Sequence, residues 1–468
     1  MNIEYGDTSG NLTGFQRGKN QTLVGVVTQD NILYGDAYGI LDFARGGNDT
    51  LRGSTEVSNT FFGDARWMSN FARGGHDTLS LQGTDSTPTT TSILYGDAYE
   101  MSDLAAGGRD VFNLVGSYAQ GTLYGDAYWM SELTRGGHDI FNAGDGGGTF
   151  YGDAHVMSGW ARGGHDEMTG GNGNNLQTIL YGDAYQMSGF TRGGNDKLDP
   201  GWWGIVYGDA YTMTGRSRGG HDTITAGGRV SELFYGDAKS MSGRSVGGND
   251  TMNIGSQIHT VYGDAYEISD YARGGHDTIA GDGFQSDLFG DAYTMSGRVR
   301  GGNDKLTGGN NLVSNELFGD AYTMGGRSKG GHDVLTAGAG SSENLQNDLY
   351  GDAYKMSGNT CGGNDRLVAS SAVADMWGDA KFMFDHAKGG RDTFAFSGEF
   401  GDTRIHDFQQ GKDRLEINVD RSLNPFSQVE WERVGSDVVV TVDGPVSEGE
   451  FRLAGFSGTL KNNDFYFV

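Results

Sequence analysis

The chain has 468 residues, of which 83 are glycine and only 4 are proline, and its formal net charge is −27 at pH 7. This composition excludes collagen and proline-rich disorder, and it indicates many tight turns. The charge disfavours nucleic acid and anionic membranes as partners, since both repel an acidic protein, and it makes cations the natural complement.

Residues 1–32 begin with a degenerate motif, Tyr5-Gly6-Asp7. We interpret them as a divergent first coil or cap, because terminal repeats of a solenoid must cover an otherwise open end. The N-terminus lacks a basic region followed by an apolar core, so no cleaved export signal is expected there. No apolar run approaches the roughly 20 residues needed for a transmembrane segment. The single cysteine, Cys361, excludes an intramolecular disulfide framework.

Residues 33–396 contain thirteen copies of one motif, shown in full by LYGDAYQMSGFTRGGNDKL at 180–198. Each copy has a first aspartate after an aromatic-Gly pair and, thirteen residues later, a second aspartate after Gly-Gly-x. The mean period is (379 − 36)/12, about 28.6 residues, yet the spacing between the two aspartates never varies, which indicates a geometric requirement. The first aspartates are Asp36, Asp64, Asp97, Asp126, Asp153, Asp183, Asp209, Asp237, Asp264, Asp291, Asp320, Asp352 and Asp379. The second aspartates are Asp49, Asp77, Asp110, Asp139, Asp166, Asp196, Asp222, Asp250, Asp277, Asp304, Asp333, Asp365 and Asp392.

Apolar residues stand three positions before every first aspartate and two positions after every second aspartate, as Leu180 and Leu198 do. These isolated apolar positions, bounded by glycine turns, predict brief strands whose side chains form internal ladders. Met or Ile stands four positions after the first aspartate, as Met187 does, and core filling is a simpler role for it than soft-metal ligation. The segment 184–190 fits either one helical turn or a wide loop. The expected fold is all-β, a parallel β-roll or β-solenoid of about 13 coils.

Three further positions repeat. The residue two before the first aspartate is always aromatic, as Tyr181 is, and strand alternation places its ring outward, where it suits sugar rings or contacts between molecules. The alternative is a ladder of stacked rings that stabilises the roll. His or Asn precedes the second aspartate in eleven copies, and we expect hydrogen bonds between copies there in preference to zinc binding. The frequent Arg four before the second aspartate, such as Arg192, is expected to offset aspartate charge, and polyanion binding is disfavoured by the net charge.

The motif ends near Phe396, and residues 397–468 are expected to form a separate module. Alternating apolar and polar residues at 437–442 and 450–453 predict ordinary strands. We therefore expect three parts, namely an N-terminal divergent coil or cap at 1–32, a repeat solenoid at 33–396 and a small C-terminal β cap domain at 397–468.

The repeated aspartates point to calcium. Ca²⁺ takes six to eight oxygen ligands from carboxylates and backbone carbonyls, and glycine lets carbonyls face inward. The copies contribute 26 carboxylates, close to the net charge of −27, so multiple ions, roughly one per coil, would nearly neutralise the protein. The alternative is that the aspartates only cap turns, but stacked carboxylates would then repel one another without a counter-ion.

Gly-Gly-x-Asp-x-apolar, preceded by apolar-aromatic-Gly-Asp, resembles the RTX (hemolysin-type) calcium-binding repeat, with consensus G-G-x-G-x-D-x-U-x and a parallel β-roll fold. The resemblance covers about residues 33–396. It implies that Asp49 and its twelve counterparts ligate calcium together with carbonyls of the preceding glycines, such as Gly46 and Gly47 or Gly193 and Gly194. The first aspartates are candidates for the same role. The chain departs from the consensus because a further glycine is missing and the coil is longer than two nonapeptides.

The C-terminal module resembles the uncleaved secretion region of RTX proteins that use the type I pathway. The similar residues are Asp407-Phe408, Gly411-x-Asp413-Arg414-Leu415 and the final residues 464–468. This resemblance implies a secreted, extracellular or cell-surface protein of a Gram-negative bacterium, which stays unfolded at low cytosolic calcium and folds outside. A cap without a secretion role fits the same residues.

No zinc-protease HExxH, G-x-S-x-G elbow or phosphate-binding loop is present, so we do not expect an enzyme. The predicted function is that of a secreted calcium-binding structural protein, serving as an adhesin or as a surface-layer, matrix or filament subunit, with self-assembly as a candidate partnership. One alternative is a polysaccharide-binding module that uses the aromatic positions. Another is a polysaccharide-modifying solenoid enzyme similar to lyases and epimerases.

Overall fold

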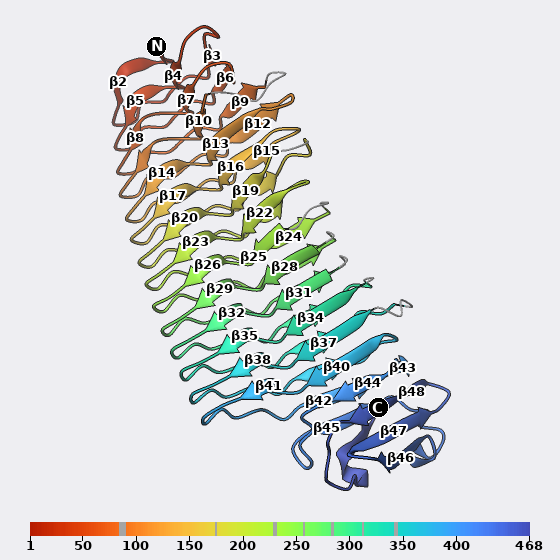
Figure 1. Cartoon of the computed structure of the whole chain (residues 1–468). Helices are drawn as coiled ribbons and strands as arrows, with labels where there is room; N and C mark the ends of the chain where they lie inside the picture. Colours follow the sequence, from red (N-terminus) through yellow and green to blue (C-terminus); the bar gives the residue numbers. More distant parts are fainter. Residues whose placement is uncertain are drawn as a thin grey trace. The chain divides into compact units, whose positions relative to one another are not determined.

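The fold is an all-β parallel β-solenoid of about 14 turns with a small antiparallel C-terminal part, which confirms the predicted fold class (Figure 1). The computed structural model describes residues 1–83, 90–173, 176–227, 232–255, 258–281, 285–310, 313–340 and 345–468. The chain comprises two compact units, Met1–Gly248 and Asn249–Val468. In the described part of the chain, no helix is long and apolar enough to cross a membrane.

In the unit Met1–Gly248, each turn contributes one short strand to each of three parallel sheets. The first sheet contains β1 (Asn2–Tyr5), β4 (Asn31–Tyr34), β7 (Asn59–Phe62), β10 (Ile93–Tyr95), β13 (Gln120–Tyr124), β16 (Gly147–Tyr151), β19 (Thr178–Tyr181), β22 (Gly204–Tyr207) and β25 (Glu232–Tyr235). The second sheet contains β2 (Thr8–Leu12), β5 (Ala37–Ile40), β8 (Trp67–Met68), β11 (Glu100–Met101), β14 (Ala127–Met130), β17 (Ala154–Met157), β20 (Ala184–Met187), β23 (Ala210–Met213) and β26 (Ala238–Met241). The third sheet contains β3 (Thr22–Val24), β6 (Thr50–Ser54), β9 (Thr78–Gln82), β12 (Val111–Val115), β15 (Ile140–Asn142), β18 (Glu167–Thr169), β21 (Lys197–Asp199) and β24 (Thr223–Ala226).

The unit Asn249–Val468 repeats the same three-sheet turn. Its first sheet contains β28 (Ile258–Tyr262), β31 (Gln285–Phe289), β34 (Ser314–Phe318), β37 (Gln346–Tyr350) and β40 (Val373–Trp377). Its second sheet contains β29 (Ala265–Ile268), β32 (Ala292–Met295), β35 (Ala321–Met324), β38 (Ala353–Met356) and β41 (Ala380–Met383). Its third sheet contains β27 (Thr251–Ile254), β30 (Thr278–Gly281), β33 (Lys305–Thr307), β36 (Val334–Thr336), β39 (Arg366–Val368) and β42 (Thr393–Phe396).

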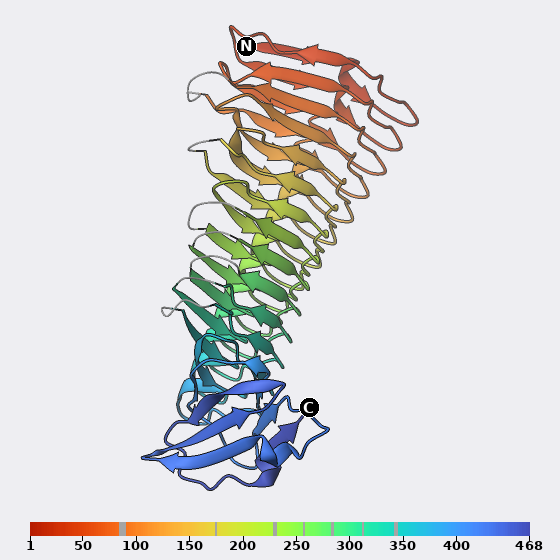
Figure 2. The same ribbon diagram turned by 90° about the vertical axis from the view of Figure 1, so that its right-hand side faces the viewer.

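The C-terminal part of this second unit joins the solenoid through its strands, as the blue segment of Figure 2 shows. Strand β44 pairs with β40, and β45 followed by β49 extends the third sheet in parallel. Strands β46, β47 and β48 form an antiparallel meander that contains both stretches predicted as ordinary strands. The elements are β43 (Gly398–Glu399), β44 (Thr403–Ile405), β45 (Arg414–Ile417), the 3₁₀ helix η1 (Pro425–Ser427), β46 (Val429–Val434), β47 (Asp437–Asp443), β48 (Ser447–Leu453), the 3₁₀ helix η2 (Asn462–Asp464) and β49 (Phe465–Phe467).

The core lies where the repeated apolar positions predict it. Neighbouring turns pair in register, so that Leu180 lies beside Val206 in the adjacent strand. Both predicted apolar ladders are buried in all thirteen copies, and the Met or Ile positions are buried in all but one, since Met383 is 38% exposed. The segment after the first aspartate is a short strand, neither a helical turn nor a wide loop, and it ends in a turn where Gly189 has φ of 83°.

The aromatic positions are buried, so the expectation of an outward stripe is wrong and the stacked ladder is the observed arrangement. The thirteen rings are 0–8% exposed, and the centroid of the Tyr181 ring lies 4.7 Å from that of Tyr207. Strand alternation fails here because the chain bends directly after Tyr181, at Gly182, so that Leu180 and Tyr181 both face the interior. The ladder therefore contributes apolar burial and ring stacking along the solenoid.

The bend at Gly182 leaves no room for a side chain, which gives a stability prediction. A methyl group there would lie 1.6 Å from the carbonyl oxygen of Gly208 and 2.5 Å from Asp196 Oδ2. We expect Gly182→Ala to lower the free energy of unfolding by about 3 kcal/mol, because backbone has to move. Gly227→Ala is the matched control, since nothing lies within 4 Å of its added methyl group. Equal denaturation midpoints for the two variants would contradict the packing described here.

Candidate cation-binding aspartate columns

The first aspartates tie together the two glycine turns of their own copy. In every copy a carboxylate oxygen accepts a hydrogen bond from the backbone N–H of the second glycine of Gly-Gly, eleven residues later, as Asp183 Oδ1 does from Gly194 at 2.7 Å. This bond explains the constant spacing of the two aspartates, because it holds the two turns face to face. The donors are Gly47, Gly75, Gly108, Gly137, Gly164, Gly194, Gly220, Gly248, Gly275, Gly302, Gly331, Gly363 and Gly390.

The second aspartates form a column in which each carboxylate bonds to the neighbouring turn. Asp196 Oδ1 accepts a hydrogen bond of 2.7 Å from the backbone N–H of Asp166, and the same contact recurs in successive copies within each unit. The other oxygen, Oδ2, is buried without a hydrogen-bond partner in many copies. This orphaned Oδ2 belongs to Asp49, Asp77, Asp110, Asp139, Asp166, Asp196, Asp304, Asp333, Asp365 and Asp392.

Glycines line the space between the columns, and their surroundings are rich in oxygen. A methyl group on Gly193 would lie 1.9 Å from Asp209 Oδ1 and 2.3 Å from Asp183 Oδ2, so carboxylates of two successive copies flank this glycine. In the described chain, no hydrogen bond ends on the carbonyl oxygens predicted as ligands, those of Gly46, Gly47, Gly193 and Gly194. Each copy therefore combines carboxylate oxygens with carbonyl oxygens that have no hydrogen-bond donor.

Burial and mutual repulsion raise the pKa values of these carboxyl groups. Burial raises the pKa of Asp49 to about 7, and the neighbouring Asp36 carboxylate adds to the shift. The pKa of Asp36 itself rises to about 6, mainly through burial. The pKa of Asp196 lies well above its usual range because of burial first and the nearby Asp183 second. Near neutral pH, the folded columns therefore require bound protons or cations.

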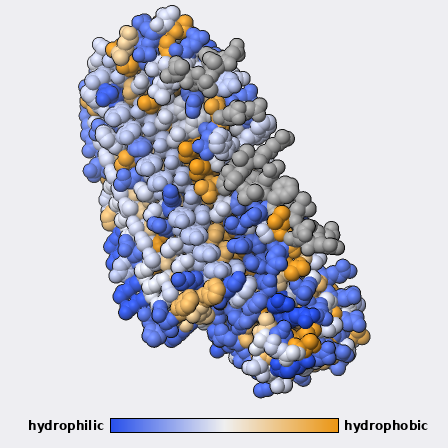
Figure 3. Space-filling model, viewed as in Figure 1, coloured by the Kyte–Doolittle hydropathy of each residue, from blue (hydrophilic) through white to orange (hydrophobic). Residues whose placement is uncertain are grey.

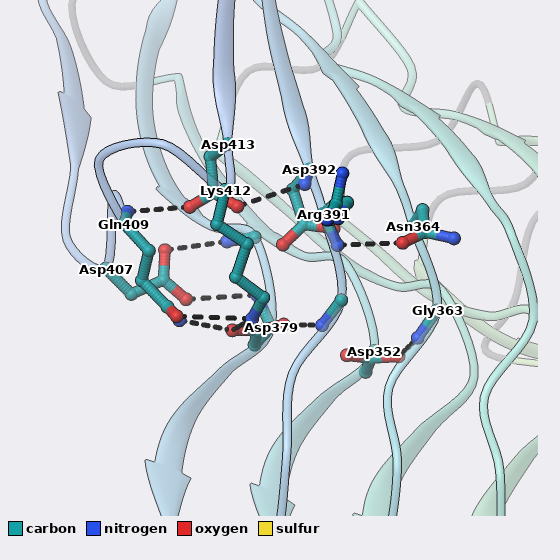
Figure 4. Close-up of polar contacts among 12 residues, drawn as sticks. Asp352, Gly363, Asn364, Asp379, Arg391, Asp392, Asp407, Gln409, Lys412 and Asp413 are labelled. Carbon is teal, nitrogen blue, oxygen red and sulfur yellow. Dashed lines mark hydrogen bonds and ion pairs between the residues drawn. The ribbon is translucent and has the colours of Figure 1, made fainter. Parts of the chain in front are cut away.

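The columns extend past the last repeat into the C-terminal part, as Figure 4 shows. Asp413 Oδ1 accepts a hydrogen bond of 3.1 Å from Asp392 N–H and so continues the column of second aspartates. The Asp407 carboxylate accepts hydrogen bonds from the backbone N–H groups of Gly378 and Asp379 at 2.8 and 3.0 Å. In the other turns, backbone carbonyls of the next turn accept the equivalent hydrogen bonds. At the last turn, the Asp407 side chain takes the place of these carbonyls.

Sequence reasoning assigned Asp407 and Asp413 to the secretion region and missed their place in the columns. The signal for Asp413 was present, because Gly411-Lys412-Asp413-Arg414-Leu415 keeps the Gly-x-Asp-x-apolar end of the motif. The motif was not recognised because the glycine that precedes Gly411 in the repeat pattern is missing.

Lysine side chains stand at the first and last turns. Lys412 Nζ lies 3.9 Å from Asp379 Oδ2, which also accepts a hydrogen bond of 2.9 Å from Gln409 Nε2 (Figure 4). In the first turn, Lys19 Nζ lies 3.2 Å from Asp7 Oδ1. A tethered ammonium group thus neutralises part of the charge where a column begins or ends.

The two other repeated polar positions lie outside the columns. The His and Asn side chains before the second aspartate accept backbone hydrogen bonds from the next copy, as His165 Nδ1 does from Asn195 N–H at 2.6 Å, which confirms the predicted contact between copies. The Arg positions, such as Arg192, are exposed and form no ion pair within the described chain. The expected offset of aspartate charge therefore does not arise from direct ion pairs of these arginines within the described residues.

Among the described residues, no three His, Cys, Asp or Glu side chains form a group that would hold a metal ion by themselves. The donor set fits a hard cation only when carboxylates of successive copies are completed by backbone carbonyls. The chain matches no protein-family model and no curated protein.

The raised pKa values predict how the stability of the metal-free protein depends on pH. The folded pKa values of Asp36 (about 6) and Asp49 (about 7) exceed the value near 4 expected in an unfolded chain. Between about pH 4 and about pH 7 the folded state therefore binds more protons, and its free energy of unfolding falls as pH rises. Urea denaturation of metal-free protein across this interval tests the sign. A midpoint that rises with pH would contradict the raised pKa values.

Proposed function

We propose that the chain is a secreted calcium-binding structural protein whose repeats fold when they bind extracellular Ca²⁺. The observation that carries the proposal is the pair of buried aspartate columns with their orphaned carboxylate oxygens. All 26 aspartates of the copies are 0–2% exposed. Buried ionised carboxylates are very unfavourable unless they are paired or coordinate metal ions, so cations would supply much of the folding free energy.

The oxygen-only donor set favours calcium over softer metals. The second aspartates would contribute their Oδ2 atoms, and carbonyls of the Gly-Gly turn, such as those of Gly193 and Gly194, would add neutral ligands. The first aspartates, such as Asp183, flank the same glycines and would add further carboxylate oxygens. Ca²⁺ accepts such flexible, mixed carboxylate and carbonyl shells, whereas Mg²⁺ demands near-ideal octahedral geometry and zinc prefers nitrogen and sulfur.

The resemblance of the motif to RTX repeats supports the same proposal and adds a route of export. A chain that stays unfolded at low cytosolic calcium passes through a type I secretion channel and folds outside. The proposed location is therefore extracellular or at the cell surface. The proposed role is that of an adhesin or of a surface-layer, matrix or filament subunit. The buried rings of the aromatic ladder, such as Tyr181, give no support to a glycan-binding stripe.

Calcium titration of metal-free protein at neutral pH tests the folding step. We expect circular dichroism to change cooperatively from an unfolded to a β-rich spectrum, with roughly one ion bound per copy in isothermal titration calorimetry. The physical reason is that ion binding removes repulsion along both columns at once. A chain that is equally folded in chelator and in calcium would falsify the proposal.

Substitution within the column of second aspartates tests the ligands. The triple variant Asp139→Asn, Asp166→Asn, Asp196→Asn keeps each Oδ1 acceptor and replaces each orphaned Oδ2. We expect it to bind about three fewer ions and to need more calcium to fold. The control Glu56→Gln, Glu100→Gln, Asp145→Asn removes three charges from exposed positions and should titrate like the natural chain. An unchanged number of bound ions in the first variant would remove the second aspartates from the ligand set.

A further inference from the structure

An exposed apolar row follows the second sheet in the unit Met1–Gly248, past strands such as β14, β17 and β20, which lie along the left side of Figure 1. One side chain per turn contributes, with exposed fractions of 40–84%. Rings in adjacent turns stack, and the centroids of Trp160 and Phe190 lie 4.2 Å apart. The row consists of Phe15, Phe43, Phe71, Leu104, Leu133, Trp160 and Phe190. On the face drawn in Figure 3, by contrast, hydrophilic residues predominate and apolar residues gather in small groups.

An arginine row runs beside the apolar row. It lies two residues further along each turn, and isolated parallel bridges join its backbone from turn to turn. From the second turn on, a fully buried small residue such as Ala161 or Thr191 stands between the two rows, so both flanking side chains point outward. The arginine row consists of Arg17, Arg45, Arg73, Arg135, Arg162, Arg192 and Arg218, and within the described chain none of them forms an ion pair.

The two rows border one groove with a volume of about 370 Å³. The Arg216 guanidinium carbon lies 5.4 Å from the centroid of the Phe190 ring, so this arginine joins the basic side of the groove. The principal lining residues are Trp160, Arg162, Phe190, Arg192, Arg216 and Arg218. The groove therefore presents several guanidinium groups next to apolar ring edges.

Most acidic residues of the same edge lie in turns before the groove, and among the described residues only Glu132 borders it, next to the lining residue Leu133. In earlier turns, the position before the apolar row carries Asp42, Asp103 and Glu132 in the left-handed region, with φ near 60°. In the turns that form the groove, the corresponding residues are Gly159, Gly189 and Gly215. The basic character of the edge is consequently strongest from Trp160 to Arg218.

The net charge of −27 does not describe this surface. Of the 61 acidic residues, the 26 aspartates of the columns are buried, which leaves 35 acidic residues against 34 lysines and arginines. The net charge alone therefore does not decide whether this edge binds an anionic partner. Local charge, and not the total, decides what the edge attracts.

We propose that this edge docks the protein on a bilayer surface that contains anionic phospholipid. Guanidinium groups bind phosphate in bidentate fashion, and a row of aromatic and leucine side chains enters the interfacial region of a bilayer. A soluble polyanion would use the arginines but leave the apolar row in water. A two-fold contact that buries the apolar rows of two copies against each other would leave both arginine rows without an anionic partner. Vesicles that contain phosphatidylglycerol offer phosphate groups to the arginine row and an interfacial region to the apolar row.

Vesicle flotation with the full chain, in a buffer where circular dichroism shows it folded, tests the proposal. We expect binding to phosphatidylcholine vesicles that contain phosphatidylglycerol, weak binding to phosphatidylcholine alone, and loss of binding at high salt. The variant Arg162→Gln, Arg192→Gln, Arg218→Gln should lower the partition coefficient on the order of 100-fold, since each arginine contributes separately near an anionic surface. Phe43→Ser, Phe71→Ser, Trp160→Ser should weaken binding to the same vesicles.

The control Arg52→Gln, Lys197→Gln, Lys305→Gln removes the same charge from exposed positions outside the edge and should bind like the natural chain. One calcium concentration is used throughout, so bridging of acidic groups to lipid by calcium affects all variants equally. Three results overturn the proposal: equal loss in the control and the arginine variant, equal binding to vesicles without anionic lipid, or no vesicle binding. If vesicles are not bound, retention on heparin identifies a polyanion site, and self-association in sedimentation velocity that the apolar variant abolishes identifies a contact between copies.

Discussion

The interaction on which the structure depends is the hydrogen bond from a glycine N–H to the buried carboxylate of a first aspartate. It joins the two glycine turns of a copy, and its reach fixes the distance between Asp183 and Asp196 to thirteen residues in every copy. Glycine is required because a side chain would strike carboxylate or carbonyl oxygens. The same arrangement leaves the opposite carboxylate with one oxygen unsatisfied. A solenoid built on this contact is therefore incomplete without protons or cations, whatever else stabilises it.

The ends of the columns show how the chain handles that requirement where the repeat stops. At the last repeat, Asp407 and Asp413 supply acceptors from the C-terminal part, and Lys412 brings an ammonium group to Asp379. In the first turn, Lys19 stands beside Asp7, and Gln21 occupies the place of a second aspartate. At each terminal turn, a lysine thus approaches an aspartate of the columns. In the first turn, the neutral Gln21 also replaces a second aspartate. In interior turns such as that of Asp183 and Asp196, no lysine or arginine of the described residues forms an ion pair with the column aspartates, so these turns depend on protons or external ions.

Sequence reasoning succeeded where a residue type had one physical use. The apolar positions of Leu180 and Leu198 can only be core in a chain that repeats every turn, and they are buried. It failed where a bend overrides strand alternation, because the outward position of Tyr181 was deduced for a straight strand and the chain turns at the next residue. It also failed at Asp413, where one missing glycine concealed a column member whose neighbour in space is far away in the chain. The burial of the aspartates could not be predicted from the sequence either, because it arises from stacking between turns.

Side chains alternate between the two faces of the backbone. This alternation, which led to the wrong prediction for the aromatic position, separates the buried aspartate columns from the exposed arginine row. Ala161 and Thr191 face the core, so Arg162 and Arg192 beside them point to solvent and cannot reach the carboxylates, which lie inside. Their positive charge consequently does not neutralise the columns, even though the counts of basic residues and of remaining acidic residues nearly match. The columns are left with the need for protons or cations, and the arginines stay available for the anionic partner proposed above. One backbone pattern therefore places carboxylates in the interior and guanidinium groups on an exposed edge.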